Sequence, residues 1–351
     1  MKFIHIADVH LGAQPEGADI GKVERGKEIW NTLEKVIHIC EEKQTDLLLI
    51  AGDLFHRQPL QRELKELNFL FSKLTKTKVV WIAGNHDYIK QDSYYRSFKW
   101  CENVYPILGR EMECIEFPTL QTAVYGLSYY SKEIEEAKYD EAYAMGKQKY
   151  EILLAHGGDE SHIPIKKEKL IALGYDYVAL GHIHKPQVLV PDKIVFAGAL
   201  EPIDKNDIGQ HGYVEGEITE DRYRARFRPF AKREYMHIEI SVDESVTNGE
   251  LKERIREAIR ENGIQNIYKF IVKGFRDADI EFDTDTEKYV GNVIEIDDRT
   301  TPFYDFETLL KKNKENLLGR YIESLQDSEP GSVEYKALYE GVQALLLMKG
   351  K

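Results

Sequence analysis

Five short segments of the sequence carry side chains of the kinds that bind metal ions. They are Asp8-Val9-His10, Gly52-Asp53, Gly84-Asn85-His86-Asp87, His156-Gly157 and Gly181-His182-Ile183-His184. The candidate ligands are carboxylates, one amide and imidazoles, with no cysteine: Asp8, His10, Asp53, Asn85, His156, His182 and His184. Such ligands suit octahedral Mn²⁺ or Fe²⁺ or borderline Zn²⁺, and not a closed structural zinc site. Seven ligands are too many for one ion, so the pattern predicts two ions that share a carboxylate.

An apolar run precedes each segment and is typical of a buried strand. The runs are residues 3–7, 47–51, 79–83, 152–155 and 177–180. Loops at the carboxyl ends of strands are where open α/β sheets assemble their sites. We therefore expect an α/β fold in which these strand ends bring the candidate ligands together.

The other histidines do not join this pattern. His5 alternates with apolar neighbours inside the first strand, and His38 lies within a predicted helix. His162, His211 and His237 have no ligand partner nearby in the sequence. All five are predicted to be packed or surface histidines.

The order of the segments resembles the calcineurin-like metallophosphoesterases, and among them the bacterial SbcD nucleases. The resemblance rests on residues 5–12 (HIADVHLG), 51–56 (AGDLFH), 84–87 (GNHD) and 181–187 (GHIHKPQ), and it covers most of residues 1–230. It implies a two-sheet metallophosphoesterase sandwich flanked by helices.

The resemblance also implies a role for each candidate ligand. Asp8, His10, Asp53 and His184 would hold one ion, and Asp53, Asn85, His156 and His182 would hold the other. Asp53 would then bridge two divalent ions, Mn²⁺ being the expected metal. Two ions about 3.5–4 Å apart can share a hydroxide and aim it in line at phosphorus.

His86 would be the catalytic imidazole that touches the phosphate rather than a metal. It could protonate the leaving alkoxide or stabilise its charge. Asp87 would orient His86 or its loop, with capping of the following helix or turn as an equal alternative. In SbcD-like nucleases a histidine at the place of His56 faces the DNA phosphate.

Two features distinguish the chain within this superfamily. Serine/threonine protein phosphatases carry an acidic-arginine pair after Gly-Asp and a Glu after Gly-Asn-His, where this chain has Phe55-His56 and Asp87. That argues against a protein phosphatase. The segment 196–204, with Ala199 and Glu201-Pro202, departs from the Gly-Ser pair and acidic stretch usual in SbcD-like chains.

Composition favours a cytoplasmic enzyme of about two domains and an appendage. The 351 residues are 42% hydrophobic, and the three cysteines form no pair motif, which fits a reducing compartment. No run is long and apolar enough for a membrane span. A cleaved signal peptide would remove Asp8 and His10.

The formal net charge of −13 is unusual for a protein that binds DNA. Positive charge is concentrated in Arg222, Arg224, Arg226 and Arg228, which alternate with other residues and so share one strand face. They could follow a phosphate backbone. The alternative is a solvated strand face paired with nearby glutamates.

The chain is expected to divide into a catalytic domain at residues 1–232, an α+β cap domain at 233–301 and a helical segment at 302–351. One amphipathic helix is predicted over 306–325 and a second over 332–348. The helical segment would either fold back on the cap or dock on an SbcC-like ATPase. A broad apolar helix at 60–74, with the aromatic residues of 94–100, predicts either a core face or a homodimer contact.

Two functions remain open from the sequence. The first is a Mn²⁺-dependent DNA nuclease of double-strand break repair, with the 3′–5′ exonuclease and endonuclease activities that the resemblance implies. The second is a phosphodiesterase of small molecules such as cyclic nucleotides. A binding protein with a degenerate site is disfavoured because no motif ligand is missing.

Overall fold

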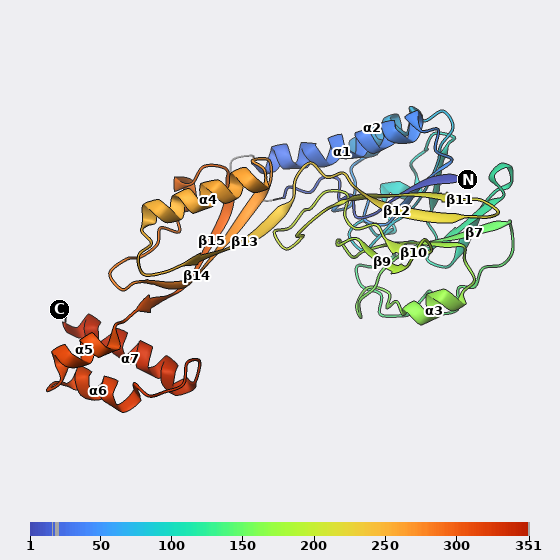
Figure 1. The fold of residues 1–351 in the computed structure, drawn as a ribbon. Coiled ribbons are helices and arrows are strands. Elements are labelled where there is room, and N and C mark those ends of the chain that lie inside the picture. The colour runs from blue at the N-terminus through green and yellow to red at the C-terminus, as the bar shows by residue number, and fades with distance from the viewer. Residues whose placement is uncertain (16, 18–20, 350–351) are drawn as a thin grey trace. The chain divides into compact units, whose positions relative to one another are not determined.

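The computed structural model of the chain describes residues 1–15, 17 and 21–349. They form two compact units (Figure 1). The first contains Met1–His237, Asn262–Lys269 and Gly291–Ile294, and the second contains Ile238–Glu261, Phe270–Val290 and Glu295–Lys351. No helix in the described part of the chain is both long and apolar enough to cross a bilayer.

The first unit contains two six-stranded sheets. The first sheet has the order β12-β11-β1-β2-β3-β4 and the second has the order β5-β6-β7-β8-β10-β9. The strands of the first sheet are β1 (Lys2–Ile6), β2 (Leu47–Ala51), β3 (Lys78–Ile82), β4 (Val104–Ile107), β11 (Gly212–Ile218) and β12 (Tyr223–Pro229). Those of the second are β5 (Glu113–Phe117), β6 (Thr122–Gly126), β7 (Tyr150–His156), β8 (Tyr177–Gly181), β9 (Gln187–Val190) and β10 (Ile194–Phe196).

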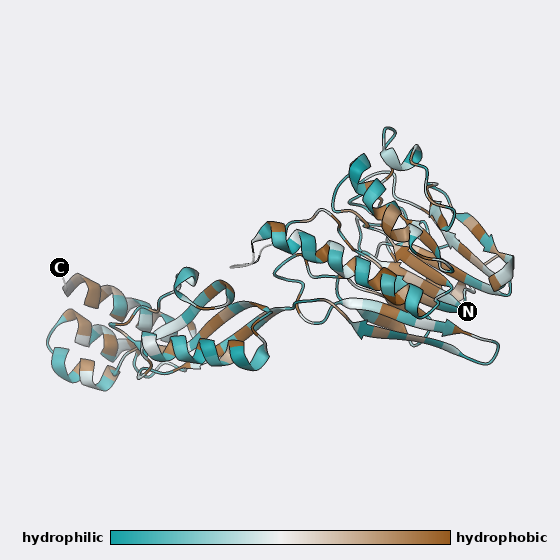
Figure 2. Cartoon of the chain, turned by 90° about the horizontal axis from the view of Figure 1, so that it is seen from above, coloured by the Kyte–Doolittle hydropathy of each residue, from teal (hydrophilic) through white to brown (hydrophobic). Residues whose placement is uncertain are grey.

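Alternation along the strands builds three cores, because successive side chains point to opposite faces of a sheet. Phe3 and Leu49 of the first sheet pack between the two sheets with Ile152 of the second. Ile4 points to the opposite face, which α1 (Lys22–Glu42) and α2 (Gln61–Ser72) cover. The outer face of the second sheet packs against α3 (Lys167–Ala172). Several strands in the middle of these sheets are hydrophobic in Figure 2. The predicted sandwich of two sheets between helices is confirmed.

The five strands that precede the candidate ligands form as predicted. In the first sheet β1, β2, β3 and β4 are parallel neighbours, and in the second β6, β7 and β8 are. Parallel strands present their carboxyl ends at one edge. Five of these ends carry the motif segments.

The helix at 60–74 is mostly a core element. Leu64, Leu67, Leu70 and Phe71 are buried within the chain. Tyr95 is also buried, so it is not free for a dimer contact. Phe69 and Tyr94 are 59% and 45% exposed. The homodimer stays a prediction, and only these two of the aromatic residues are well exposed for it.

A third sheet has the order β13-β14-β15, formed by Tyr235–Val242, Ile267–Asp277 and Asn292–Phe303. Helix α4 (Asn248–Asn262) connects its first two strands. Leu251, Ile255 and Ile259 form the buried face of α4. The third sheet and α4 give the α+β arrangement expected for residues 233–301, whereas the predicted domain bounds stay a prediction.

The C-terminal segment forms three helices: α5 (Phe306–Asn313), α6 (Leu317–Leu325) and α7 (Val333–Lys349). The single helix predicted over 306–325 is therefore wrong. Asn316 caps α6 by accepting a hydrogen bond from the Gly319 N–H, which starts a new helix. The three helices enclose their own small core, built of Tyr304, Leu318, Ile322, Leu338 and Val342.

Candidate metal centre

The seven predicted ligands lie together at one edge of the two large sheets. Asp8 and His10 follow β1, Asp53 follows β2, Asn85 follows β3, His156 ends β7, and His182 and His184 follow β8. The His182 N–H donates to both carboxylate oxygens of Asp8, at 3.1 and 3.0 Å. This contact ties the first sheet to the second across the centre.

Glycines before the ligands allow the loops to approach closely. A Cβ at Gly84 would lie 2.2 Å from Asp53 Oδ1, and one at Gly181 would lie 1.9 Å from the Ala51 carbonyl oxygen. Several ligands also adopt the left-handed backbone region that costs energy for residues other than glycine: Asp8 (φ 48°), His10 (φ 52°), Asp53 (φ 48°) and His182 (φ 96°). Strain of this kind concentrates where a site over-determines the backbone.

Asp53 occupies the middle of the centre. Its Oδ2 lies 3.9 Å from His10 Nε2 and 3.5 Å from His156 Nε2. Its Oδ1 accepts a hydrogen bond from the His86 N–H at 2.9 Å. One carboxylate oxygen therefore faces imidazoles that come from two different sheets, which is the placement that a bridging ligand needs.

The histidines present a lone pair to the centre because their other nitrogen is held from outside. His156 Nδ1 lies 2.8 Å from the Ala51 carbonyl oxygen and so must carry the proton, which leaves Nε2 free toward Asn85 Oδ1 at 3.0 Å. His184 Nδ1 contacts the Asp207 carboxylate at 3.0 Å.

The pairing of His184 with Asp207 fixes the tautomer of a second imidazole. His184 Nε2 then lies only 3.1 Å from His10 Nε2. Two nitrogen lone pairs that face each other at this distance repel, unless a cation or a proton lies between them. Together with the buried carboxylates of Asp8 and Asp53, this donor set fits divalent cations, and oxygen and imidazole ligands suit Mn²⁺, Fe²⁺ or Zn²⁺.

Asp207 is expected to act through His184. Changing Asp207 to Asn should weaken binding of the ion at His184 by about 10–100-fold, because the carboxylate that orients the ring is lost. Calorimetric titration with Mn²⁺ measures the effect. Asp204→Asn is the matched control, since Asp204 lies exposed in the same loop and its carboxylate bonds Asn206. An equal loss of affinity in the two variants would show that the negative charge of the loop matters, and not the orientation of the His184 ring.

Burial raises the pKa of the central carboxyl groups. The pKa of Asp8 is raised to about 7, and that of Asp53 is raised well above its usual range by burial and by the charges of Asp87 and Asp8. Burial also holds the pKa values of His10 and His156 well below the usual value. The imidazoles of His10 and His156 are therefore neutral at pH 7. The pKa of His184 is instead raised, because the effect of its burial is outweighed by its hydrogen bond to Asp207 and by nearby carboxylate charges.

Metal binding should weaken as the pH falls through about 7. Above this pH Asp8 is ionised and ready to bind, whereas below it an ion must displace its proton. Each displaced proton lowers the affinity by about tenfold per pH unit. Titrations with Mn²⁺ at pH 6, 7 and 8, in buffers of different ionisation enthalpy, measure both affinity and proton release. A constant affinity with no proton release would contradict this expectation.

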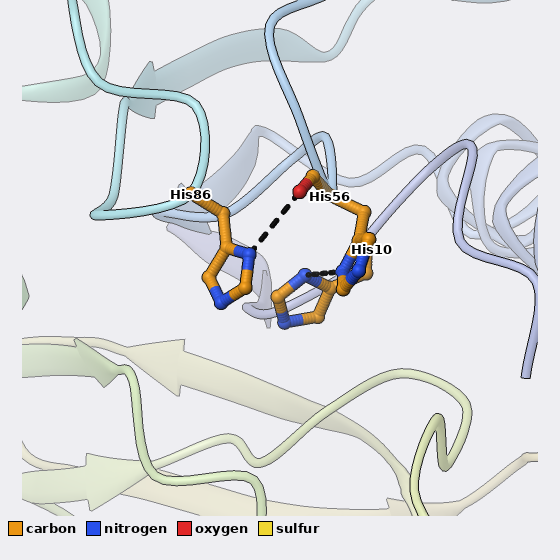
Figure 3. A group of neighbouring side chains, drawn as sticks. All are labelled: His10, His56 and His86. Atoms are coloured by element: carbon orange, nitrogen blue, oxygen red, sulfur yellow. Dashed lines mark hydrogen bonds between the residues drawn. The ribbon is translucent and has the colours of Figure 1, made fainter. Parts of the chain in front are cut away.

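His56 and His86 form a histidine group with His10 at the side of the centre (Figure 3). The rings of His56 and His86 are stacked, with centroids 4.9 Å apart. His86 Nδ1 lies 3.1 Å from the His56 carbonyl oxygen, so it donates and leaves Nε2 available. His56 Nδ1 lies 3.3 Å from His10 Nδ1. If His10 Nε2 binds a metal, His10 Nδ1 donates, and the proton of His56 is on its own Nε2.

Asp87 holds loops rather than a helix end. Its carboxylate accepts hydrogen bonds from the Gly84 N–H at 2.9 Å, the Phe55 N–H at 3.1 Å and the Tyr95 hydroxyl at 2.8 Å. The side chain is buried. Of the two roles that the sequence left open, this geometry favours orientation of the loop that carries Asn85 and His86.

Asp207, Asp159 and His162 lie at the centre although the sequence did not single them out. His182 Nε2 lies 2.7 Å from Asp159, and His162 Nδ1 lies 2.9 Å from the same carboxylate. His162, predicted to be a packed or surface histidine, is partly buried, and the fold brings its ring beside that of His182. The short spacing Asp159-x-x-His162, close after His156-Gly157, was the signal that could have indicated it.

The other histidines match their predictions. His5 is buried, with Nδ1 at 3.0 Å from the Tyr177 hydroxyl, and His38 is exposed beside Glu42. His211 is buried and contacts the Gly209 carbonyl oxygen, and His237 contacts that of Lys205.

The departing segment 196–204 supports the loop of His184. The N–H of Ala199 donates to the His184 carbonyl oxygen at 2.8 Å. Glu201 is buried and accepts a hydrogen bond from the Thr32 hydroxyl at 2.6 Å. The residues that replace the usual hydroxyl thus have structural contacts next to the centre.

Comparison with known proteins places this centre in a family. Residues 1–186 match the family described as Calcineurin-like phosphoesterase. The uncharacterized metallophosphoesterase YhaO of Bacillus subtilis is 27% identical over 239 residues, which cover 62% of this chain and 58% of that protein. The DNA double-strand break repair protein Mre11 of Methanocaldococcus jannaschii is 28% identical over 218 residues, which cover 59% and 58%.

A third relative is the SbcD subunit of the nuclease SbcCD of Staphylococcus epidermidis, 25% identical over 249 residues that cover 60% of this chain and 64% of that protein. The chain spans less than two thirds of the length of each of these relatives. The family match alone covers 186 of 351 residues and includes every segment from Asp8 to His184. The chain therefore belongs to the calcineurin-like phosphoesterase family.

Proposed function

We propose that the chain is a Mn²⁺-dependent DNA nuclease of the kind represented by SbcD and Mre11, with 3′–5′ exonuclease and endonuclease activity in double-strand break repair. The observation that carries the proposal is the stacked pair of His56 and His86 beside the metal centre. The pair offers two imidazoles to a substrate phosphate, and His56 belongs to Phe55-His56, where protein phosphatases of the superfamily have an acidic-arginine pair. The names of the Mre11 and SbcCD relatives support the same function.

Each side chain of the centre would have a defined role in hydrolysis. Asp8, His10, Asp53 and His184 hold one ion, and Asp53, Asn85, His156 and His182 hold the other. Two bound divalent ions would supply Lewis acidity and lower the pKa of a water molecule. His86 Nε2, whose ring is fixed through Nδ1, meets the phosphate or the leaving oxygen. The Nε2–H of His56 adds a second donor, and Asp87 keeps the His86 loop in place.

A phosphodiesterase of small molecules is the second candidate. The net charge of −13 favours it, because an acidic surface repels a polyanion more strongly than a cyclic nucleotide. The helical segment and the third sheet favour the nuclease, since a small substrate gives them no obvious use.

One experiment separates the two candidates. The full chain with Mn²⁺ is given linear duplex DNA labelled at its 3′ or 5′ end, single-stranded circular DNA, or 3′,5′-cyclic nucleotides. A nuclease releases the 3′ label first as mononucleotide and opens the circle. Turnover of cyclic nucleotides with intact DNA would overturn the proposal. Asp53→Ala is the negative control against a contaminating nuclease.

We also propose that the C-terminal helices bind an SbcC-like ATPase subunit. The three helices have their own core, and Leu317, Val333 and Leu347 remain exposed on them. Deleting residues 303–351 should therefore leave Mn²⁺-dependent cleavage within about threefold of the full chain but abolish co-purification with such a subunit. Loss of the folded state on deletion, seen by circular dichroism, would assign the helices to the fold instead.

A cytoplasmic location and a homodimer stay predictions. The three cysteines are free thiols in the structure, as a reducing compartment permits. Light scattering at micromolar concentration, with Phe69→Asp as the comparison, would test the dimer.

A further inference from the structure

A groove of about 340 Å³ lies on the first sheet away from the metal-binding loops. Basic side chains dominate its lining: Lys2, Lys43, Arg224, Arg226 and Arg228, against the acidic residues Glu215 and Glu217. The chain as a whole carries a net charge of −13. A groove with five basic and two acidic residues is therefore a local exception on an acidic protein.

The strand register places the arginines on the helix-covered face of the sheet. Arg226 pairs with Glu215, which pairs with Ile4 on β1. Directly paired residues point to the same face of a sheet. Because Ile4 packs in the core beneath α1, the arginines stand on that face, where β12 forms the edge of the sheet. Lys43 and Thr45, just after α1, form the other wall.

The arginines form a straight row that points toward the catalytic edge. Alternate residues on a strand lie about 6.6 Å apart. β12 is antiparallel to β11, and β11 is antiparallel to β1, so β12 runs in the direction of β1. Arg228 is therefore at the end of the row nearer the edge where Asp8 and His10 follow β1.

Most of this positive charge is not neutralised within the protein. Arg228 Nε contacts Glu215 Oε2 at 2.9 Å, and Lys43 contacts the same carboxylate. Within the described residues, the side chains of Arg222, Arg224 and Arg226 have no hydrogen-bond or ion-pair partner. Pairing with nearby glutamates, the alternative that the sequence left open, thus accounts for Arg228 alone.

We propose that this groove binds the sugar–phosphate backbone of one DNA strand, next to the segment that enters the metal centre. A strand is a polyanion with regularly repeated charges, which a row of evenly spaced arginines matches, and arginine is the residue best suited to bind phosphate. The proposal rests on the nuclease function and names a second contact with the same substrate. The contact is independent of sequence, because it involves phosphates and no bases.

The test replaces two arginines and measures binding without cleavage. A fluorescent single-stranded oligonucleotide is titrated with the full chain in EDTA, and its anisotropy is followed at several salt concentrations. Arg224→Glu/Arg226→Glu should lower the affinity about tenfold or more and reduce the salt slope by about 1.4, at 0.7 for each lost phosphate contact. Lys167→Glu/Lys169→Glu on α3, on the outer face of the other sheet, makes the same charge change and should have little effect.

The outcomes separate this inference from its competitors. Equal losses in the two double variants, or no loss in either, would overturn it. ATP competing as well as the oligonucleotide would assign the groove to small polyphosphates, and polyglutamate competing better would assign it to an acidic protein; either result overturns the proposal.

A third measurement distinguishes this inference from the proposed function. Hydrolysis of bis(p-nitrophenyl) phosphate should be the same in the wild-type chain and in Arg224→Glu/Arg226→Glu, because this small diester does not reach the groove. A chain that binds DNA through the arginines but does not cleave it would refute the nuclease and leave the groove standing. If the chain cleaves DNA and the arginine variant binds DNA as well as the wild-type chain, the groove is refuted and the nuclease function stands.

Discussion

Asp53→Ala should lose both metal ions and all measurable hydrolysis. Asp53 Oδ2 lies between His10 Nε2 and His156 Nε2, at 3.9 and 3.5 Å, so it is the group placed to contact both ions. Without it, each ion loses an anionic ligand, and their mutual repulsion is no longer screened. Elemental analysis after gel filtration should find about two ions in the wild-type chain and fewer than about 0.2 in the variant, a loss well beyond that expected for the neighbouring ligands.

The comparison with other variants makes this result specific. His184→Ala should mainly weaken one ion and keep the other. Asp46→Ala removes a carboxylate that pairs with Lys76 outside the centre, and it should keep both ions. An Asp53→Ala chain that holds two ions tightly and folds normally would refute the bridging role. Circular dichroism is needed alongside, because the Asp53 side chain also accepts the His86 N–H.

The sequence predicts where the candidate ligands lie because they are tied to strand ends. An apolar run followed by Gly-Asp or Gly-Asn-His determines both where the strand stops and which side chain comes next. The structure shows why the glycine is there, since a Cβ at Gly84 would collide with Asp53. Local sequence and site geometry therefore carry the same information at these positions.

The groups that act through the ligands could not be predicted in the same way. Asp207 follows His184 by 23 residues and reaches it only because the intervening loop turns back. Asp159 and His162 meet His182 across two loops of the second sheet. No period or spacing in one sequence encodes such contacts, which depend on loop paths.

The same limit explains the error in the C-terminal segment. The apolar residues of 306–325 fit the stripe of a single helix. In the structure, however, one helix ends at Asn313 and the next begins at Leu317. The Asn316 cap was visible in the sequence, but Asn also occurs within helices. The helix breaks between α5 and α6 because the changed direction of the chain allows Leu318 and Ile322 to pack against Leu338 of α7.

His86→Ala should separate binding from chemistry. The variant is expected to keep both ions, its fold and its affinity for DNA, while the cleavage rate falls by about 10²–10⁴, the contribution of a positioned acid or charge stabiliser. The structure supplies the reason: His86 Nδ1 is held by the His56 carbonyl oxygen, and only Nε2 is left for the substrate. His38→Ala, which changes an exposed histidine on α1, is the control and should leave the rate unchanged.

The competing explanation is that the His86 ring packs the loop of Asn85 or joins His10 and His56 as a metal ligand, since the three could hold an ion. In that case His86→Ala would lose an ion and regain activity at high Mn²⁺.

A substrate with a good leaving group then distinguishes acid catalysis by His86 from charge stabilisation by His86. A nitrophenyl phosphodiester needs little protonation of its leaving group, so a proton donor at His86 predicts nearly restored turnover. A loss as large as that on DNA would mean that His86 stabilises charge on the phosphoryl oxygens. Wild-type cleavage of DNA by His86→Ala would exclude both roles, and His56, stacked on the same ring, would be the next imidazole to test.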